Sequence, residues 1–439
     1  MLEVGSDRGP NVHDARGPSG RSRPVVAILE PGGPSIRSGV AFMASALSRP
    51  GLADILVCPW YAVTFEGGAV AVRGDMSRFA GDSSNRVHID TALPVDTLIT
   101  RRADKSEFPT SSEEQEGLDA LVAIGVVPAG VDFSTAIDAL LCEAGRRGVA
   151  TNARELDGQW RDKDRLELML RADERGGGQR VRRPSTVVAT MAQLPGVVRR
   201  LARAGNGSIV KPARRSQGRG IEVVGPEAAA TWAPSTAEDR YVVQALVEDP
   251  LLVDGNKIDL RCHLIVDPDD REGSRLVEPL LMRRAGAPFA PAVPGAEIVN
   301  VDYQHREGLP AEIRPIEQWG ALPGDQRTEI RDRLAELVDA LLDAHTRWRG
   351  RVVAPERHVP RRVLLWGVDV VVARAHAGLD LYLLEVNDCP SLLRASEPAN
   401  EETRRLLGSD YLPALLAKGP RAEGLGVRLE DPGSRVSGT

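Results

Sequence analysis

The chain has 439 residues, 42% hydrophobic and 27% charged, which is typical of soluble globular proteins and long enough for two or three domains. A net charge of −6 gives no basic footprint for nucleic acid, and no apolar run reaches the length of a membrane span. The four cysteines, Cys58, Cys142, Cys262 and Cys389, are too far apart to indicate a zinc site or a disulfide framework. Residues 1–23 lack the apolar core of a signal peptide and are expected to form a disordered tail. We therefore expect a cytoplasmic protein without membrane or nucleic-acid partners.

The first part of the chain alternates between short apolar segments and helical patterns. Strands are expected at 24–30, 53–58, 96–100 and 148–152, and helices at 39–47 and 134–147. This alternation favours an α/β domain over residues 24–152 with a largely parallel sheet. No GxGxxG opens a helix, so dinucleotide binding has little support.

The second part has more strands, many of them separated only by turns. Helices are expected at 162–171, 194–204 and 326–347, and strands at 185–190, 208–212, 221–224, 240–247, 257–266, 275–282, 363–372 and 381–386. The last two strands are close in sequence and separated by a Gly-containing turn, which favours a hairpin. Residues 417–439 again resemble a tail.

Two carboxylates and an amide fall on the last two predicted strands. Glu385 and Asn387 are two positions apart, so they project from the same face of their strand. A hairpin would bring Asp369 on the neighbouring strand close to them. Such oxygen ligands suit Mg²⁺, particularly when it is also held by nucleotide phosphates. The alternative is an ordinary pair of core strands with a satisfied polar end.

A lysine closes the strand at 208–212 and is followed by a Gly-containing loop and a second strand. Only five of the 56 basic residues are lysines, so Lys211 suggests that a compact ammonium is needed there. Backbone N–H groups of the loop at 213–220 could face a triphosphate. The loop is not a Walker A loop, because no GKS or GKT follows. A hairpin loop with solvated arginines is the commoner explanation of such a pattern.

Two further strands carry polar side chains. Gln244 ends a strand ahead of a short apolar linker, Ala245–Leu246, and this arrangement can read an adenine edge. Lys257, Asp259 and Arg261 alternate and face one side of their strand, which would be costly if they were buried without partners. An exposed face with mutual ion pairs is the alternative. A basic pair, Arg283 and Arg284, follows near the end of another strand.

The order of these patterns resembles that of ATP-grasp ligases, and most closely the tubulin–tyrosine ligase-like family. The stretches that carry the resemblance are Lys211-Pro212, Ser216 to Ile221, Tyr241 to Gln244, Asn256 to Arg261, Gly367 to Asp369 and Leu384 to Asn387. It covers about residues 155–415. It implies an ATP-grasp fold, in which two α+β subdomains clamp ATP, preceded by an α/β pre-ATP-grasp domain. The expected boundaries are 1–23, 24–152, 153–247 (central subdomain), 248–416 (C-terminal subdomain with the metal site) and 417–439.

The resemblance also implies a role for each matching residue. Nucleotide-binding residues would be Lys163, Lys211, Ser216, Gln217, Gly218, Arg219, Gly220, Gln244, Ala245, Leu246, Lys257, Asp259 and Asn300. Catalytic residues would be Lys257, Arg261 and Arg283, with the two arginines at the substrate carboxylate and the transferring phosphoryl group. Metal ligands would be Asp369, Glu385 and Asn387. Asp388-Cys389 and Arg284-Ala285-Gly286 depart from the family pattern, which indicates a different acceptor pocket.

The implied activity is an ATP- and Mg²⁺-dependent carboxylate–amine ligase that forms an amide through an acylphosphate. The expected substrates are an amino acid and a peptide or protein. An ATP-grasp kinase of a small molecule shares the nucleotide half and remains an alternative. A non-catalytic ATP-binding scaffold is a second alternative, although every expected metal and phosphate position is filled.

Overall fold

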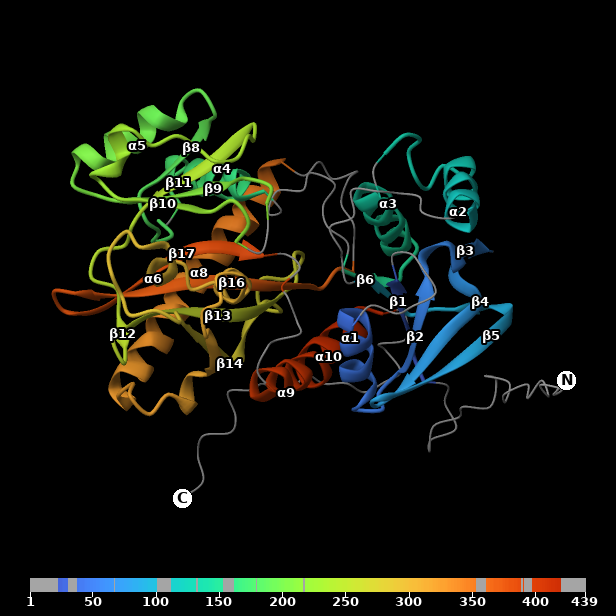
Figure 1. Cartoon of the computed structure of the whole chain (residues 1–439). Coiled ribbons are helices and arrows are strands. Elements are labelled where there is room, and N and C mark those ends of the chain that lie inside the picture. Colours follow the sequence, from blue (N-terminus) through green and yellow to red (C-terminus); the bar gives the residue numbers. More distant parts are fainter. Residues whose placement is uncertain are drawn as a thin grey trace, which may run out of the picture. The chain divides into compact units, whose positions relative to one another are not determined.

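The chain divides into two compact units in a computed structural model (Figure 1). Unit 1 comprises residues 1–156, 359–363 and 404–439, and unit 2 comprises residues 157–358 and 364–403. The structure describes residues 23–30, 38–66, 68–100, 112–131, 133–152, 162–178, 180–215, 218–352, 361–387, 390 and 397–419. The expected boundaries between tails, N-terminal domain and two subdomains stay predictions.

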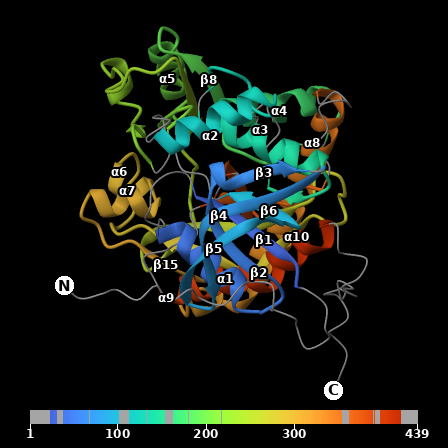
Figure 2. The ribbon, with the colours of Figure 1, turned by 90° about the vertical axis from the view of Figure 1, so that its right-hand side faces the viewer.

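Unit 1 is built on a seven-stranded mixed sheet. Its parallel part has the order β2 (Asp54–Pro59), β1 (Val25–Glu30), β6 (Thr97–Thr100) and β7 (Ala150–Thr151). The helices are α1 (Ser38–Ser48), α2 (Ser112–Ala123), α3 (Phe133–Arg146) and α10 (Leu412–Lys418). Figure 2 shows α2 and α3 along one face of this sheet and α1 along the other. Alternating β1 residues therefore meet different helices, and every β1 side chain is buried.

The antiparallel part of this sheet was not predicted. Strands β3 (Val63–Glu66), β4 (Ala69–Ala80) and β5 (Ser83–Pro94) are antiparallel, and β4 extends the sheet beyond β2. The expectation of a largely parallel sheet is therefore correct only for the other four strands. Most β5 residues are exposed, so this strand lacks the apolar run that reveals a buried strand.

Unit 2 contains two antiparallel sheets. The four-stranded sheet has the order β10 (Glu222–Val224), β9 (Ser208–Pro212), β11 (Arg240–Ala245) and β8 (Thr186–Thr190), and α5 (Leu194–Arg203) packs on it. The six-stranded sheet has the order β15 (Glu312–Pro315), β14 (Arg275–Arg284), β13 (Asn256–Val266), β16 (Leu364–Ala375) and β17 (Gly378–Asn387), with β12 (Leu252–Val253) on β13. The predicted hairpin of the last two strands is confirmed.

The remaining helices are α4 (Lys163–Arg175), α6 (Pro294–Glu297), α7 (Val301–Arg306), α8 (Gly324–Val352) and α9 (Glu397–Arg405). Apolar residues of α4 and α8 form one core with alternate residues of the six-stranded sheet, such as Leu260, Val368 and Leu383. The opposite face of the same strands carries the polar side chains of the next section. Because successive side chains of a strand point to opposite faces of the sheet, the apolar residues form the core on one face and the polar residues form the site on the other.

No helix in the described ranges has both the length and the apolar character needed to cross a lipid bilayer.

Candidate functional site

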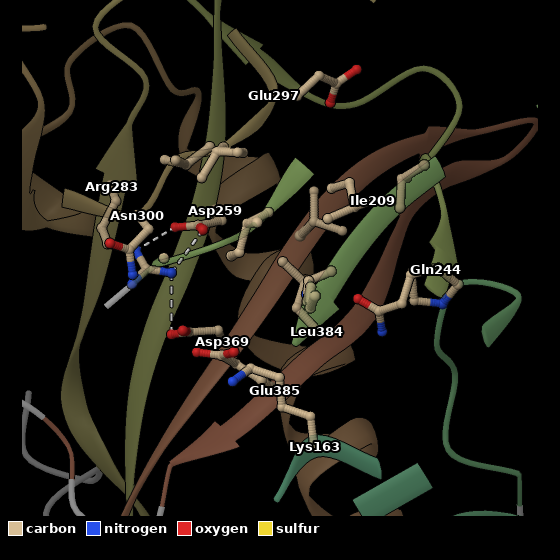
Figure 3. A pocket seen from close by; sticks show the side chains of 18 of the residues that line it. Lys163, Ile209, Gln244, Asp259, Arg283, Glu297, Asn300, Asp369, Leu384 and Glu385 are labelled. Carbon is tan, nitrogen blue, oxygen red and sulfur yellow. Dashed lines mark hydrogen bonds and ion pairs between the residues drawn. The ribbon is translucent and has the colours of Figure 1, made fainter. Parts of the chain in front are cut away.

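A cavity of about 940 Å³, part of it open to solvent, is lined by both sheets of unit 2 (Figure 3). The residues predicted from the sequence that line it are Lys163, Lys211, Gly218, Arg219, Gln244, Ala245, Lys257, Asp259, Arg283, Asn300, Asp369, Glu385 and Asn387. Three others, Gly220, Leu246 and Arg261, are not among its lining residues. Ser216, Gln217, Asp388 and Cys389 lie outside the described residues.

The register of β16 and β17 gathers the three predicted metal ligands. Asp369 lies directly opposite Glu385, and Gly367 lies opposite Asn387. Cross-strand partners share a face of the sheet, so both carboxylates point into the cavity. The Asn387 amide nitrogen donates to a Glu385 carboxylate oxygen at 3.0 Å, which turns its own oxygen away from that carboxylate.

A β-bulge interrupts the hairpin beside this pair. Asp369 pairs with Glu385, but Val370 pairs with Leu383, so Leu384 is the extra residue. Leu384 and Glu385 consequently both line the cavity although they are adjacent in sequence. An apolar surface and a carboxylate thus come from consecutive positions of one strand.

Two arginines bind the carboxylates of the six-stranded sheet in a buried chain of ion pairs. Arg283 donates to both oxygens of Asp259 at 2.6 and 2.7 Å, and its Nη2 also lies 3.1 Å from an Asp369 oxygen. Arg261 pairs with Asp369 through two nitrogens, the Nη2 contact being 2.6 Å. All four side chains are at most 6% exposed. Arg261 lies behind Asp369 rather than in the cavity wall, and its predicted substrate contact stays a prediction.

The charge of Asp369 is held by these arginines. Burial alone would raise the pKa of its carboxyl, but the guanidinium groups of Arg261 and Arg283 outweigh burial and bring the pKa below its ordinary value. Asp369 is therefore ionised at neutral pH and retains its negative charge at the cavity.

The three lysines at the cavity differ in their partners. The Lys257 ammonium is 2.5 Å from the buried carboxylate of Glu297, so its charge is neutralised locally. Lys163 donates to the Arg215 carbonyl oxygen at 2.5 Å and thereby ties the start of α4 to the loop after β9. Among the described residues, Lys211 has no hydrogen-bond or ion-pair partner. Burial lowers the pKa of its ammonium below the ordinary 10.5, and Glu385 only partly opposes that shift.

Gln244 offers an unused acceptor to the cavity. Its side chain is 95% buried, and within the described part of the chain its Oε1 has no hydrogen-bond partner. The backbone N–H groups of Ala245 and Leu246 are already donated to Ser185 and Gly207 carbonyl oxygens at 2.8 and 2.9 Å. Recognition of a ligand here therefore rests on the Gln244 side chain more than on those two N–H groups.

The glycine-containing loop lies close to α7. Gly218 has a φ of +69°, and a side chain there would approach Tyr303 Cβ at 3.0 Å. Only glycine combines that backbone conformation with that close approach. Asn300 caps α7 by accepting a hydrogen bond from the Tyr303 N–H at 3.0 Å, and it also lines the cavity.

Sequence reasoning missed the apolar walls and one carboxylate. Ile209 and Val371 are two positions from Lys211 and Asp369, so strand alternation could have revealed them. Leu384 faces the cavity only because of the bulge. Glu297 lies on α6, which is too short to produce a helical pattern in the sequence, so its place in the cavity could not be predicted.

The comparisons with known proteins cover part of the chain that lines this cavity, including Lys211 and Gln244 but not Asp369, Glu385 or Asn387. No curated protein matches the chain. The resemblance expected from the sequence is nevertheless confirmed over the stretch from the start of α4 to just beyond β13, and in broad terms it implies an ATP-dependent ligase. That stretch, residues 162–270, matches the model of the tubulin-tyrosine ligase family.

Proposed function

We propose that the cavity binds ATP and that the protein is a carboxylate–amine ligase with an ATP-grasp fold. In this proposal the four-stranded and six-stranded sheets belong to the two subdomains, 153–247 and 248–416, that hold the nucleotide between them. The observation that carries the proposal is that one cavity holds both a buried ammonium group and a carboxylate. The Lys211 ammonium is buried near Glu385, and neither group has an ion-pair partner among the described residues, whereas Asp369 is already paired with two arginines. A ligand that brings phosphates and a cation would neutralise Lys211 and Glu385 together.

The adenine would lie between apolar side chains. Ile209 and Leu384, which come from different sheets, line the cavity together with Gln244 (Figure 3). The Gln244 carbonyl oxygen, which has no partner among the described residues, can accept from the exocyclic amine of adenine. The phosphates would then extend towards Lys211 and Lys163, where compact ammonium groups supply positive charge.

The residues also fit a magnesium ion. Asp369 and Glu385 offer two carboxylates, and Asn387 would add its amide oxygen once its amide, whose nitrogen donates to Glu385, turns over. Such oxygens are the hard donors that Mg²⁺ prefers. Nowhere in the described chain do three His, Cys, Asp or Glu side chains gather for a metal, so the amide and the phosphates would complete this set. When bound, Mg²⁺ would neutralise charge on the transferring phosphoryl group.

The chemistry would proceed in two balanced steps. A substrate carboxylate oxygen attacks the γ-phosphorus of ATP, and the bond to the β-phosphate oxygen breaks to give an acylphosphate and ADP. A neutral amine then attacks the acyl carbon, the bond from that carbon to the phosphate oxygen breaks, and the proton lost by the amine leaves with the phosphate as HPO₄²⁻. Arg283, held by Asp259, would stabilise negative charge on the transferring group. The loop that carries Gly218 would exclude water from the acylphosphate.

An assay of ADP release tests the proposal. We expect ADP to form from ATP and Mg²⁺ only when a carboxylate and an amine substrate are both present, supplied first as pooled amino acids with a peptide mixture. We expect those substrates to be an amino acid and a peptide or protein, acting in the cytoplasm. A stable phosphorylated product without an amine would instead identify a kinase. Nucleotide binding without turnover would identify a scaffold, and absence of nucleotide binding would refute all three.

Lys211 predicts a proton uptake on nucleotide binding. Its pKa is lowered in the free protein, and phosphates would raise it, so the complex binds more protons than the free protein. Uptake should grow as the pH rises through the lowered pKa of the free ammonium, because the free protein loses this proton before the complex does. Calorimetric titration in buffers of different ionisation enthalpy measures it.

Lys211→Arg provides the control, since a guanidinium stays protonated throughout this range. That variant should bind nucleotide without the pH-dependent uptake. Equal uptake by the variant and the unaltered protein would assign the proton to another group.

A further inference from the structure

Thr186 lies opposite Gln244 in the register of β8 and β11. We infer that Thr186 is a positioning residue that fixes the Gln244 amide so that the cavity selects a purine with an amino group at position 6 over one with an oxo group. This inference rests on the proposed nucleotide site and adds its base specificity.

The direction of two hydrogen bonds carries the inference. The Thr186 hydroxyl lies 2.7 Å from the Pro184 carbonyl oxygen, and a carbonyl can only accept, so the hydroxyl proton is used there. The Thr186 oxygen can then only accept from Gln244. The contact between them, 3.4 Å from Nε2 to Oγ1, must therefore have the amide NH₂ on the Thr186 side.

This arrangement leaves the amide oxygen facing the ligand. Gln244 Oε1 is buried and has no partner among the described residues, although a buried carbonyl oxygen without a hydrogen bond is costly. A reversed amide would place its oxygen against the Thr186 lone pairs. With the Gln244 oxygen facing the cavity, only a ligand group that donates a hydrogen bond can satisfy it. A 6-amino purine has a donor at that position, whereas a 6-oxo purine has an acceptor.

The strand that carries Thr186 is itself fixed. The Thr186 backbone oxygen accepts a hydrogen bond from Arg171, whose Nε also donates to Glu167 at 2.6 Å. Thr186 is 94% buried, so its hydroxyl cannot turn towards bulk water. The orientation of the Gln244 amide thus depends on one hydroxyl proton.

Binding of ATP and of inosine triphosphate, which has an oxo group at position 6, tests the inference by calorimetry. The unaltered protein should prefer ATP. Thr186→Val removes the hydroxyl with little change of shape and should reduce that preference roughly five- to tenfold, the worth of about one hydrogen bond. Thr186→Ser should restore it, and Thr190→Val, at an exposed position of the same strand, should leave it unchanged.

A double variant separates orientation from general damage to β8. In a Gln244→Leu background no amide remains to be oriented, so adding Thr186→Val should not change the ratio of the two affinities. Thr186→Ala also removes the hydroxyl but changes the shape differently, so it should lower the ratio by a similar factor, and it serves as the test if Thr186→Val folds poorly. The inference would be overturned if the ratio of the affinities for ATP and inosine triphosphate were unchanged in both Thr186→Val and Thr186→Ala. It would also be overturned if Thr186→Val changed that ratio in the Gln244→Leu background, and in both cases ATP binding itself would still stand. Failure of the unaltered protein to bind nucleotide would overturn the proposed function and this inference together.

Discussion

Replacing Glu385 by Gln is expected to reduce ADP release by at least about a hundredfold, the order of loss when one charge-stabilising group leaves a catalytic site. The substitution keeps the size of the side chain and an oxygen that can accept from Asn387. It removes one negative charge from the pair that faces Lys211. A cation would be held less tightly, and the transferring phosphoryl group would lose neutralisation.

Glu336→Gln is the matched control for this prediction. Glu336 lies on α8 with 66% of its side chain exposed, and the same chemical change there should leave turnover unaltered. The expected defect of Glu385→Gln should also be partly relieved by raising the Mg²⁺ concentration, because weaker binding responds to mass action. Full activity of Glu385→Gln at low Mg²⁺ would mean that the carboxylate pair does not hold the cation.

Much of this site follows from the period of two in a strand. The alternation Lys257, Asp259, Arg261 predicted that these residues share a face, and they do so in β13. The short turn at Gly378 predicted that Asp369 would meet Glu385, and the two are directly opposite each other. Local spacing and a tight turn set both features, so one sequence was enough to find them.

Other features depend on registers between strands distant in sequence. Arg261 lies opposite Asp369, which is 108 residues away, and no local pattern shows that this arginine is used by a carboxylate. The bulge that turns Leu384 into the cavity is likewise a property of the β16–β17 pair. The β4–β5 ribbon was missed because most β5 residues are exposed and polar, and such a strand resembles a loop.

Replacing Arg283 by Met is expected to destabilise the protein by roughly 3–5 kcal/mol, the cost of removing one partner from a buried ion pair. Arg283 donates a hydrogen bond to each Asp259 carboxylate oxygen, and both side chains are about 95% buried. Without the guanidinium, the Asp259 carboxylate would be left in a desolvated position near Asp369. Urea unfolding followed by fluorescence or circular dichroism measures the loss.

Two companion variants decide whether the unpaired charge is the cause. Arg284→Met changes the next residue, which is partly exposed and pairs with the more exposed Asp254, so its cost should be below about 1 kcal/mol. Arg283→Met combined with Asp259→Asn removes both charges and should recover much of the stability. If the double variant is as unstable as Arg283→Met alone, the loss comes from packing around the Arg283 stem, and the buried chain of charges contributes little to the stability of unit 2.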